Sequence, residues 1–243
     1  EVVRLLLSKS DIDMNKARDD GVTALYWASQ NGHLEVVRLL LSKSDIDINK
    51  ARDSSVTESD GATALHVASQ FGRVEVVRLL LSKSEIDINK ADRDGATALL
   101  WASHNGHVEV VRLLLSKSEI DINTTDDDGC AALMHASTEG HVEVVRLLLS
   151  KSEIDINKTE DIDGWTALEA ASHNGYIEIV DLLSPNNNGV AVIDNKGEER
   201  VSELQADQHP VKSSQDGETK TCSSSSSTTT KKSNKKKKKK KNK

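Results

Sequence analysis

Histidines and carboxylates are the side chains best suited to chemistry in this chain, because imidazole can act as a base or metal ligand and carboxylates can act as acids or ligands. The chain has 8 histidines and 39 acidic residues. His33, His107 and His141 stand at one recurring position directly after a glycine, where Arg73 and Tyr176 stand in other copies. A position that accepts both Arg and Tyr is not expected to ligate a metal, so we predict a structural role, no metal and no cofactor.

Catalytic motifs are also missing from the sequence, which has no Gly-rich phosphate loop, nucleophile elbow or paired-cysteine motif. Since no constellation combines a nucleophile, a base and an orienting group, we expect no enzymatic activity. Cys130 and Cys222 lack metal or disulfide spacing, which favours a reducing compartment. No run of about 18 apolar residues predicts a membrane span. We therefore expect a cytoplasmic or nuclear location.

One decapeptide, Glu-Val-Val-Arg-Leu-Leu-Leu-Ser-Lys-Ser, organises the chain in which these polar residues are set. Its unchanged copies begin at Glu1, Glu35, Glu75, Glu109 and Glu143, and a decayed copy begins at Glu178. The steps between them are 34, 40, 34, 34 and 35 residues, and a polar insertion around residues 54–59 accounts for the longest. Self-similarity at this period predicts an array of stacked units.

Each unit is predicted to contain two short helices, as the first complete copy illustrates. Asp20-Gly21 is typical of a turn, Thr23 is a favourable helix N-cap, and Gly32 can end the helix in a left-handed conformation. A second helix is expected over about residues 34–42, with a narrow polar stripe and apolar residues on the rest of its surface. Such a helix needs neighbours on more than one side, which stacked units provide. Polar and apolar residues alternate over residues 45–49, which indicates a short extended arm.

The repeated pattern Asp-Gly-x-Thr-Ala-Leu-x-x-Ala-Ser-x-x-Gly-His-x-Glu-Val-Val-x-Leu-Leu-Leu resembles the ankyrin repeat, whose signature begins Thr-Pro-Leu-His-x-Ala. The match recurs in phase and covers residues 1 to about 184. Ala replaces the signature Pro in every copy, and the signature His is retained only as His66. The resemblance implies an all-α ankyrin-repeat solenoid of stacked helix-turn-helix units joined by short β-hairpin-like turns.

The array is expected to fill residues 1–184, with a half repeat at 1–17 and units near 18–50, 58–91, 92–125, 126–160 and 161–184. The last unit has a more polar second helix, as expected of a C-terminal cap. Because residue 1 lies in the second half of a repeat, further repeats are expected upstream. Residues 185–243 lose the periodicity, and their composition predicts a disordered low-complexity tail ending in poly-Lys.

The resemblance implies a non-catalytic, monomeric scaffold that binds a partner protein through a concave groove of turn tips and first helices. An alternative is an interaction module of a larger enzyme or membrane protein whose functional part lies upstream. The charge distribution bears on the partner, because ten of the 32 basic residues lie beyond Thr221 and the other 22 are set against 39 acidic residues. A row of like charge at the turn tips favours a partner with a basic surface, and consists of Asp20, Asp60, Asp94, Asp128 and Asp163.

The repeat copies themselves predict where the partner binds. Scaffold positions recur almost verbatim, whereas turn and first-helix-end positions differ from copy to copy, and the resemblance places these in the groove. Drift at unconstrained surface positions is the alternative explanation for any one of them. The candidate partner-binding residues are Asp19, Asp20, Val22, Gln30, Asn31, Ser59, Asp60, Ala62, Gln70, Phe71, Arg93, Asp94, Ala96, His104, Asn105, Asp127, Asp128, Cys130, Thr138, Glu139, Ile162, Asp163, Trp165, His173 and Asn174.

Four aromatic residues divide into two predicted groups. Trp27 and Trp101 share one position in the first helix, where apolar neighbours suggest packing between units. Phe71 and Trp165 stand at a helix end and a turn, where we expect partner contacts.

The lysine run of the tail has several interpretations. It could be a nuclear address, a contact to nucleic acid or acidic lipid, or an unselected low-complexity end, and we favour the last. A further hypothesis is that the basic tail folds back on the acidic turn tips and competes with partners.

Overall fold

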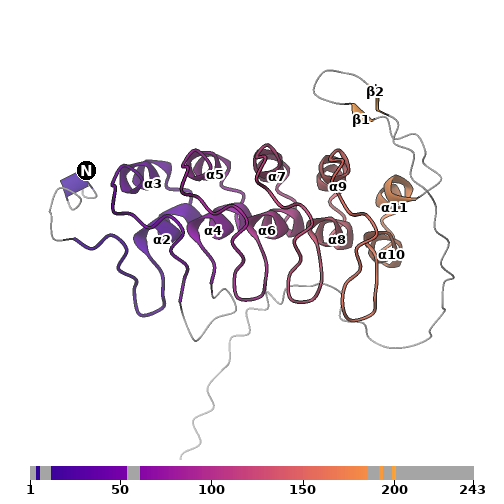
Figure 1. Cartoon of the computed structure of the whole chain (residues 1–243), viewed down its shortest axis with the longest axis horizontal. Helices are drawn as coiled ribbons and strands as arrows, with labels where there is room; N and C mark the ends of the chain where they lie inside the picture. The colour runs from indigo at the N-terminus through magenta and orange to yellow at the C-terminus, as the bar shows by residue number, and fades with distance from the viewer. Residues whose placement is uncertain (1–3, 6–11, 54–60, 185–191, 194–198, 201–243) are drawn as a thin grey trace, which may run out of the picture.

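The computed structural model describes residues 4–5, 12–53, 61–184, 192–193 and 199–200. Between residues 12 and 184 the chain forms an array of helix pairs, with the first helices in one row, the second helices in another and the connecting loops projecting from one edge (Figure 1). Ser59, Asp60 and the lysine run lie outside the described residues, as does most of the predicted tail. Within that tail, β1 (Val192–Ile193) and β2 (Glu199–Arg200) form a short antiparallel pair where no regular structure is expected.

The helices follow the predicted repeat. The first helices are α2 (Ala24–Gln30), α4 (Ala64–Gln70), α6 (Ala98–His104), α8 (Ala132–Thr138) and α10 (Ala167–His173). The second helices are α3 (Leu34–Leu40), α5 (Val74–Leu80), α7 (Val108–Leu115), α9 (Val142–Leu149) and α11 (Ile177–Leu183). The second helix of the first unit ends two residues earlier than predicted. Beyond it the Ser42 hydroxyl donates to the Leu39 carbonyl oxygen at 2.7 Å as the chain turns.

Local signals start and stop the first helices as expected. The Thr23 hydroxyl oxygen accepts a hydrogen bond from the Tyr26 amide at 3.2 Å, which satisfies one of the unpaired donors at the helix start. Gly106, after α6, has a φ of +70°, and a Cβ there would lie 2.6 Å from the His141 ring. Both the left-handed backbone and the neighbouring ring therefore require glycine at this position.

One continuous hydrophobic core runs through the array. Each first helix packs against the first helix of the next unit, and each second helix packs in the same way. In α7, Val110, Val111 and Leu114 are fully buried, because they contact both their own unit and its neighbours. This confirms that the repeated decapeptide is a packing element. Each unit is stabilised mainly by the units beside it.

Two ladders of hydrogen bonds join successive units and explain the invariant residues after each second helix. Asn49 Nδ2 donates to the Glu85 carbonyl oxygen at 2.7 Å, and its Oδ1 accepts from the Asp87 amide at 2.9 Å. Lys83 Nζ donates to the Leu41 carbonyl oxygen at 3.0 Å, at the end of the preceding second helix. The same contacts recur at Asn15, Asn89 and Asn123, and at Lys117 and Lys151.

Candidate functional site

The connecting loops between units form β-hairpin-like turns, and hydrogen bonds link neighbouring turns. In one of them the Asp92 amide donates to the Ala96 carbonyl oxygen at 3.0 Å. The Asp127 amide donates to the carbonyl oxygen of Asp94, in the preceding hairpin, at 2.9 Å. The Asp161 amide makes the same contact with Asp128, also at 2.9 Å. The last three hairpins therefore form a connected row beside the first helices.

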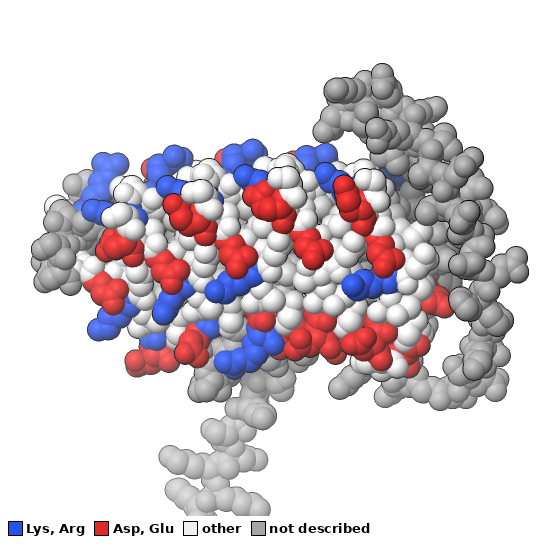
Figure 2. Space-filling model, viewed as in Figure 1, with Lys and Arg blue, Asp and Glu red and all other residues white. Residues whose placement is uncertain are grey.

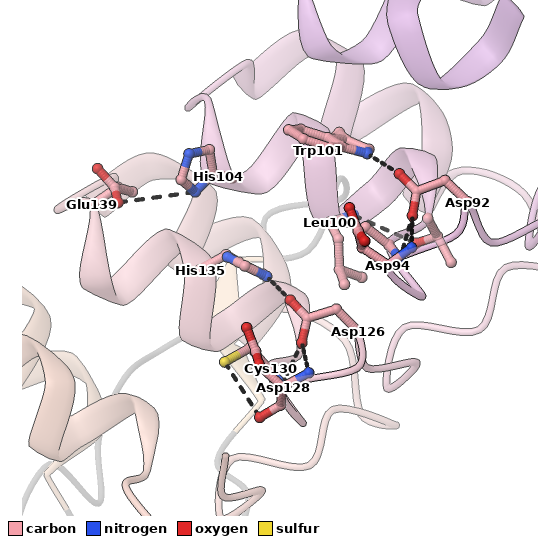
Figure 3. Close-up of polar contacts among 12 residues, drawn as sticks. Asp92, Asp94, Leu100, Trp101, His104, Asp126, Asp128, Cys130, His135 and Glu139 are labelled. Atoms are coloured by element: carbon pink, nitrogen blue, oxygen red, sulfur yellow. Dashed lines mark hydrogen bonds and ion pairs between the residues drawn. The ribbon is translucent and has the colours of Figure 1, made fainter. Parts of the chain in front are cut away.

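An acid that is buried (Asp92, Glu160) or half-buried (Asp126) lies at the base of each of these three hairpins, and two of the three hold a first-helix side chain. The Asp92 carboxylate accepts from the Asp94 and Ala96 amides at 3.1 and 2.9 Å, and from Trp101 Nε1 at 2.8 Å (Figure 3). Burial raises the pKa of Asp92 above its ordinary value, although the bonds from Trp101 and the amides oppose this. The carboxylate thus fixes both the hairpin and the indole ring.

Asp126 makes the corresponding contacts one unit later. It accepts from the Asp128 and Cys130 amides at 3.2 and 2.8 Å, and it lies 2.7 Å from His135 Nε2 (Figure 3). This contact joins the hairpin to the His135 ring on α8. The other ring nitrogen of His135, Nδ1, is buried and has no hydrogen-bond partner among the described residues.

Two more polar side chains lie near His135: His104 at the end of α6 and Glu139 directly after α8. The His104 ring meets the His135 ring edge to face at a centroid distance of 5.5 Å, and His104 Nδ1 lies 3.9 Å from a Glu139 carboxylate oxygen (Figure 3). Burial lowers the pKa of His104, the neighbouring His135 adds to this lowering, and Glu139 opposes it. The two histidine rings and the carboxylates of Asp126 and Glu139 therefore form one polar cluster beside the hairpins.

Glu160 is the base acid of the last hairpin and differs from the other two. Burial favours its neutral form, but the amides of Ile162, Trp165, Asp163 and Gly164 outweigh burial and hold its pKa below the ordinary value. Its oxygens accept from three of these amides at 2.6 to 3.2 Å. Among the described contacts, the Glu160 carboxylate therefore bonds only to the backbone of its own hairpin.

The recurring histidine position after each glycine has a packing role. His107 Nε2 lies 2.8 Å from the Gln70 carbonyl oxygen, and His141 Nε2 lies 2.9 Å from that of His104. Arg73 Nε donates to the Gln30 carbonyl oxygen at 2.9 Å in the same way. Among the described residues, no group of three or more His, Cys, Asp or Glu side chains is arranged to hold a metal ion. In that same part of the chain, no helix has the length and apolar character needed to cross a bilayer.

The structure sorts the candidate partner-binding residues by exposure. Exposed are Asp19, Asn31, Phe71, Arg93, Asp94, Asn105, Asp127, Asp128, Ile162, Asp163, His173 and Asn174. Half-buried are Asp20, Gln30, Gln70, His104, Glu139 and Trp165. Buried are Val22, Ala62, Ala96, Cys130 and Thr138.

The buried candidates lie in seams between units and offer little surface to a partner. Val22, Tyr26, Ala62 and Val67 form one small apolar cluster across the first two complete units. A second such cluster joins Cys130, Met134, Ala170 and Trp165. The residue after a hairpin glycine therefore packs across the seam between two units.

The expectation that Trp27 lies in the core is wrong. Trp27 is 52% exposed, whereas Trp101 at the same repeat position is half-buried, packs against the core and bonds to Asp92. The residue nine positions earlier is Arg18 in the first case and Asp92 in the second. Asp126 and His135 are separated by the same nine residues. This spacing is the signal in the sequence that would have identified both pairs.

The fold and the hairpin geometry agree with the comparison to protein families. The family model of ankyrin repeats, in three copies, matches residues 1–52, 49–126 and 118–196. The chain belongs to the ankyrin-repeat family, whose members generally act as protein-protein interaction modules. No match to this chain is found among curated proteins.

Proposed function

We propose that this chain is a non-catalytic scaffold that binds the basic surface of a partner protein through its hairpin tips and first helices. The supporting observation is the connected row of the last three hairpins. Their exposed carboxylates include Asp94, Asp127, Asp128, Asp161 and Asp163, and the one exposed basic residue among the described tips of this row is Arg93.

The electrostatic asymmetry of the surface agrees with this proposal. Along the lower edge of Figure 2, where the hairpins of Figure 1 lie, acidic side chains predominate toward the C-terminal end of the array. On the second helices, by contrast, Glu and Arg alternate and pair, as in Glu109 with Arg112 at 3.6 Å. Acidic side chains outnumber basic ones on these hairpins, and this net negative charge can attract a basic partner and accelerate its association.

Affinity capture with a charge-neutralised variant tests the proposal. The substitutions Asp127→Asn, Asp128→Asn and Asp161→Asn remove three negative charges from the hairpin row. A partner captured by the wild-type chain should be lost or strongly reduced with this variant, and the wild-type interaction should weaken as salt rises.

A matched control removes the same number of charges elsewhere. Glu75→Gln, Glu109→Gln and Glu143→Gln change exposed residues on the second helices, each of which pairs with an Arg in its own helix. The control should retain the partner. Equal loss with both variants would reject the hairpin row as the binding surface.

A further inference from the structure

Two exposed aromatic side chains mark the N-terminal part of the same surface. Trp27 is 52% exposed and Phe71 is 42% exposed. Trp27 belongs to α2 and Phe71 directly follows α4, and these two helices pack against each other. Arg18, at the base of the hairpin before α2, pairs with Asp20 at 3.3 Å and provides no acceptor for the indole. Trp is a frequent anchor of protein interfaces because it buries a large rigid surface and can also donate a hydrogen bond.

The C-terminal part of the surface has a different chemistry. Asp127, Asp128 and Asp161 are exposed on hydrogen-bonded hairpins before α8 and α10. Beside them His135 is only 6% exposed, yet its Nδ1 has no hydrogen-bond partner among the described residues. A buried polar atom without a hydrogen-bond partner is costly, so this atom points to a ligand that supplies a hydrogen-bonding group.

We infer that this surface binds a single partner segment in which an aromatic or long aliphatic residue is followed or preceded by a cluster of Lys or Arg. Trp27 and Phe71 bind the apolar residue, and Asp127, Asp128 and Asp161 bind the basic cluster. A basic side chain that also approaches Glu139 comes close to the buried Nδ1 atom of His135, which has no hydrogen-bond partner among the described residues. The inference rests on the proposed function and adds to it the composition of the segment and the assignment of its two ends.

The repeat geometry sets the distance between the two ends of the segment. Neighbouring packed helices lie roughly 8–10 Å apart, so two steps from α4 to α8 span roughly 16–20 Å and three steps from α2 span roughly 24–30 Å. An extended chain advances about 3.3 Å per residue. The basic cluster should therefore lie about five to nine residues from the apolar anchor.

Synthetic peptides with a fluorescein label test this arrangement against the full 243-residue chain. One peptide carries a Phe, a spacer of six Gly and Ser residues and the cluster Arg-Lys-Arg, and a second carries the same residues in reverse order. A third has a one-residue spacer, and a fourth has Gly in place of Phe. Binding is measured by fluorescence anisotropy at low salt, about 50 mM, where exposed charges are weakly screened.

In one of its two chain directions, the long-spacer peptide should bind at least about tenfold more tightly than the short-spacer and Phe-free peptides. Trp27→Ala should weaken this binding by about tenfold to thirtyfold, the range of an interface anchor. The Trp27 indole N–H resonance, identified by its absence in Trp27→Phe, should shift on binding. Ile177→Ala removes a side chain that is 74% exposed on α11, and this matched control should change affinity by less than about twofold.

The outcomes separate this inference from the proposed function. If Trp27→Ala leaves peptide affinity unchanged while the triple Asp→Asn variant lowers it, the acidic surface is retained and the aromatic anchor is rejected. If no peptide binds at about 1 mM, or all four bind equally, the segment described here is rejected. Only a failure of the triple variant to alter both peptide binding and partner capture rejects the proposed function as well.

Discussion

The two halves of the array share one backbone framework but place opposite charges at the base of their hairpins. In the first two complete units this residue is Arg18 or Arg52, and in the last three it is Asp92, Asp126 or Glu160. The backbone contacts across the turn are equivalent, since Gly21 donates to Arg18 as Gly95 donates to Asp92. The side chain at the hairpin base therefore changes the surface without changing the repeat.

Hydrogen-bonding capacity explains the difference. A carboxylate accepts from two hairpin amides and still has an oxygen for an indole or imidazole, whereas a guanidinium can only donate. Arg52 accordingly donates from Nε to the Asp20 carbonyl oxygen at 3.0 Å and lies over the Tyr26 ring. The acidic base residues of the C-terminal half hold Trp101 and His135 in place. In the N-terminal half the base residue is Arg, and Trp27 is exposed to solvent.

The largest expected effect concerns two buried histidines that lie one in each half. His135 contacts Asp126, whereas His66 in the N-terminal half accepts from the Thr63 amide at 3.0 Å and contacts the Ala96 carbonyl oxygen at 3.1 Å. Burial lowers the pKa of His66 to about 4. Between pH 6.5 and about 4 the unfolded chain binds a proton that the folded chain does not, so acidification should remove about 3 kcal/mol of stability through this residue.

The substitution His66→Gln isolates this contribution. Gln can keep the capping contact to the Thr63 amide but does not titrate. Urea unfolding followed by circular dichroism at several pH values should show a shallower loss of stability below pH 6.5 in the variant than in the wild type. Above that pH the two stability curves should run parallel, and identical slopes at acid pH would contradict the assignment.

A smaller effect should separate the two equivalent tryptophans. Trp101→Phe removes the donor to Asp92 and leaves a buried carboxylate oxygen unpaired, at an expected cost of about 1.5 kcal/mol in the free energy of unfolding. Trp27→Phe should change stability by less than about 0.5 kcal/mol, because this side chain is exposed. Urea unfolding of both variants measures the difference, and equal costs would show that the Asp92 contact is not what distinguishes them.

The smallest effect should come from giving a hairpin of the N-terminal half the acidic base residue of the C-terminal half. Arg18→Asp provides the first complete unit with the acceptor that Asp92 provides to Trp101, and it should stabilise the fold by about 0.5 kcal/mol. The more direct measurement is iodide quenching of tryptophan fluorescence, which should fall as the Trp27 indole moves toward the hairpin. Trp27→Phe and the double variant serve as controls, and unchanged quenching would show that the base residue alone does not determine exposure.

Much of the fold could be predicted because its signals are local. Thr23, Thr97 and Thr166 accept from backbone amides at the starts of their helices, and the positive φ of the helix-ending glycines follows from their lack of a side chain. Repetition of these signals in phase indicated the stacked array and its family. The assignment of partner-binding residues remains a prediction. It includes residues that are buried in the seams between units, and these offer little surface to a partner.

The sequence by itself determined the repeat length, the two helices of each unit and the continuous apolar core, because each follows from short-range preferences repeated at a constant period. Only the tertiary structure decided that Val22 and Cys130 are buried, and only it revealed that the residue nine positions before Trp101 lies beside the indole. Those outcomes depend on contacts between a hairpin and the helix after it, and between one unit and the next. The repeat period and the residue composition are the same whether a side chain is buried or exposed at such a contact, so they cannot predict its exposure.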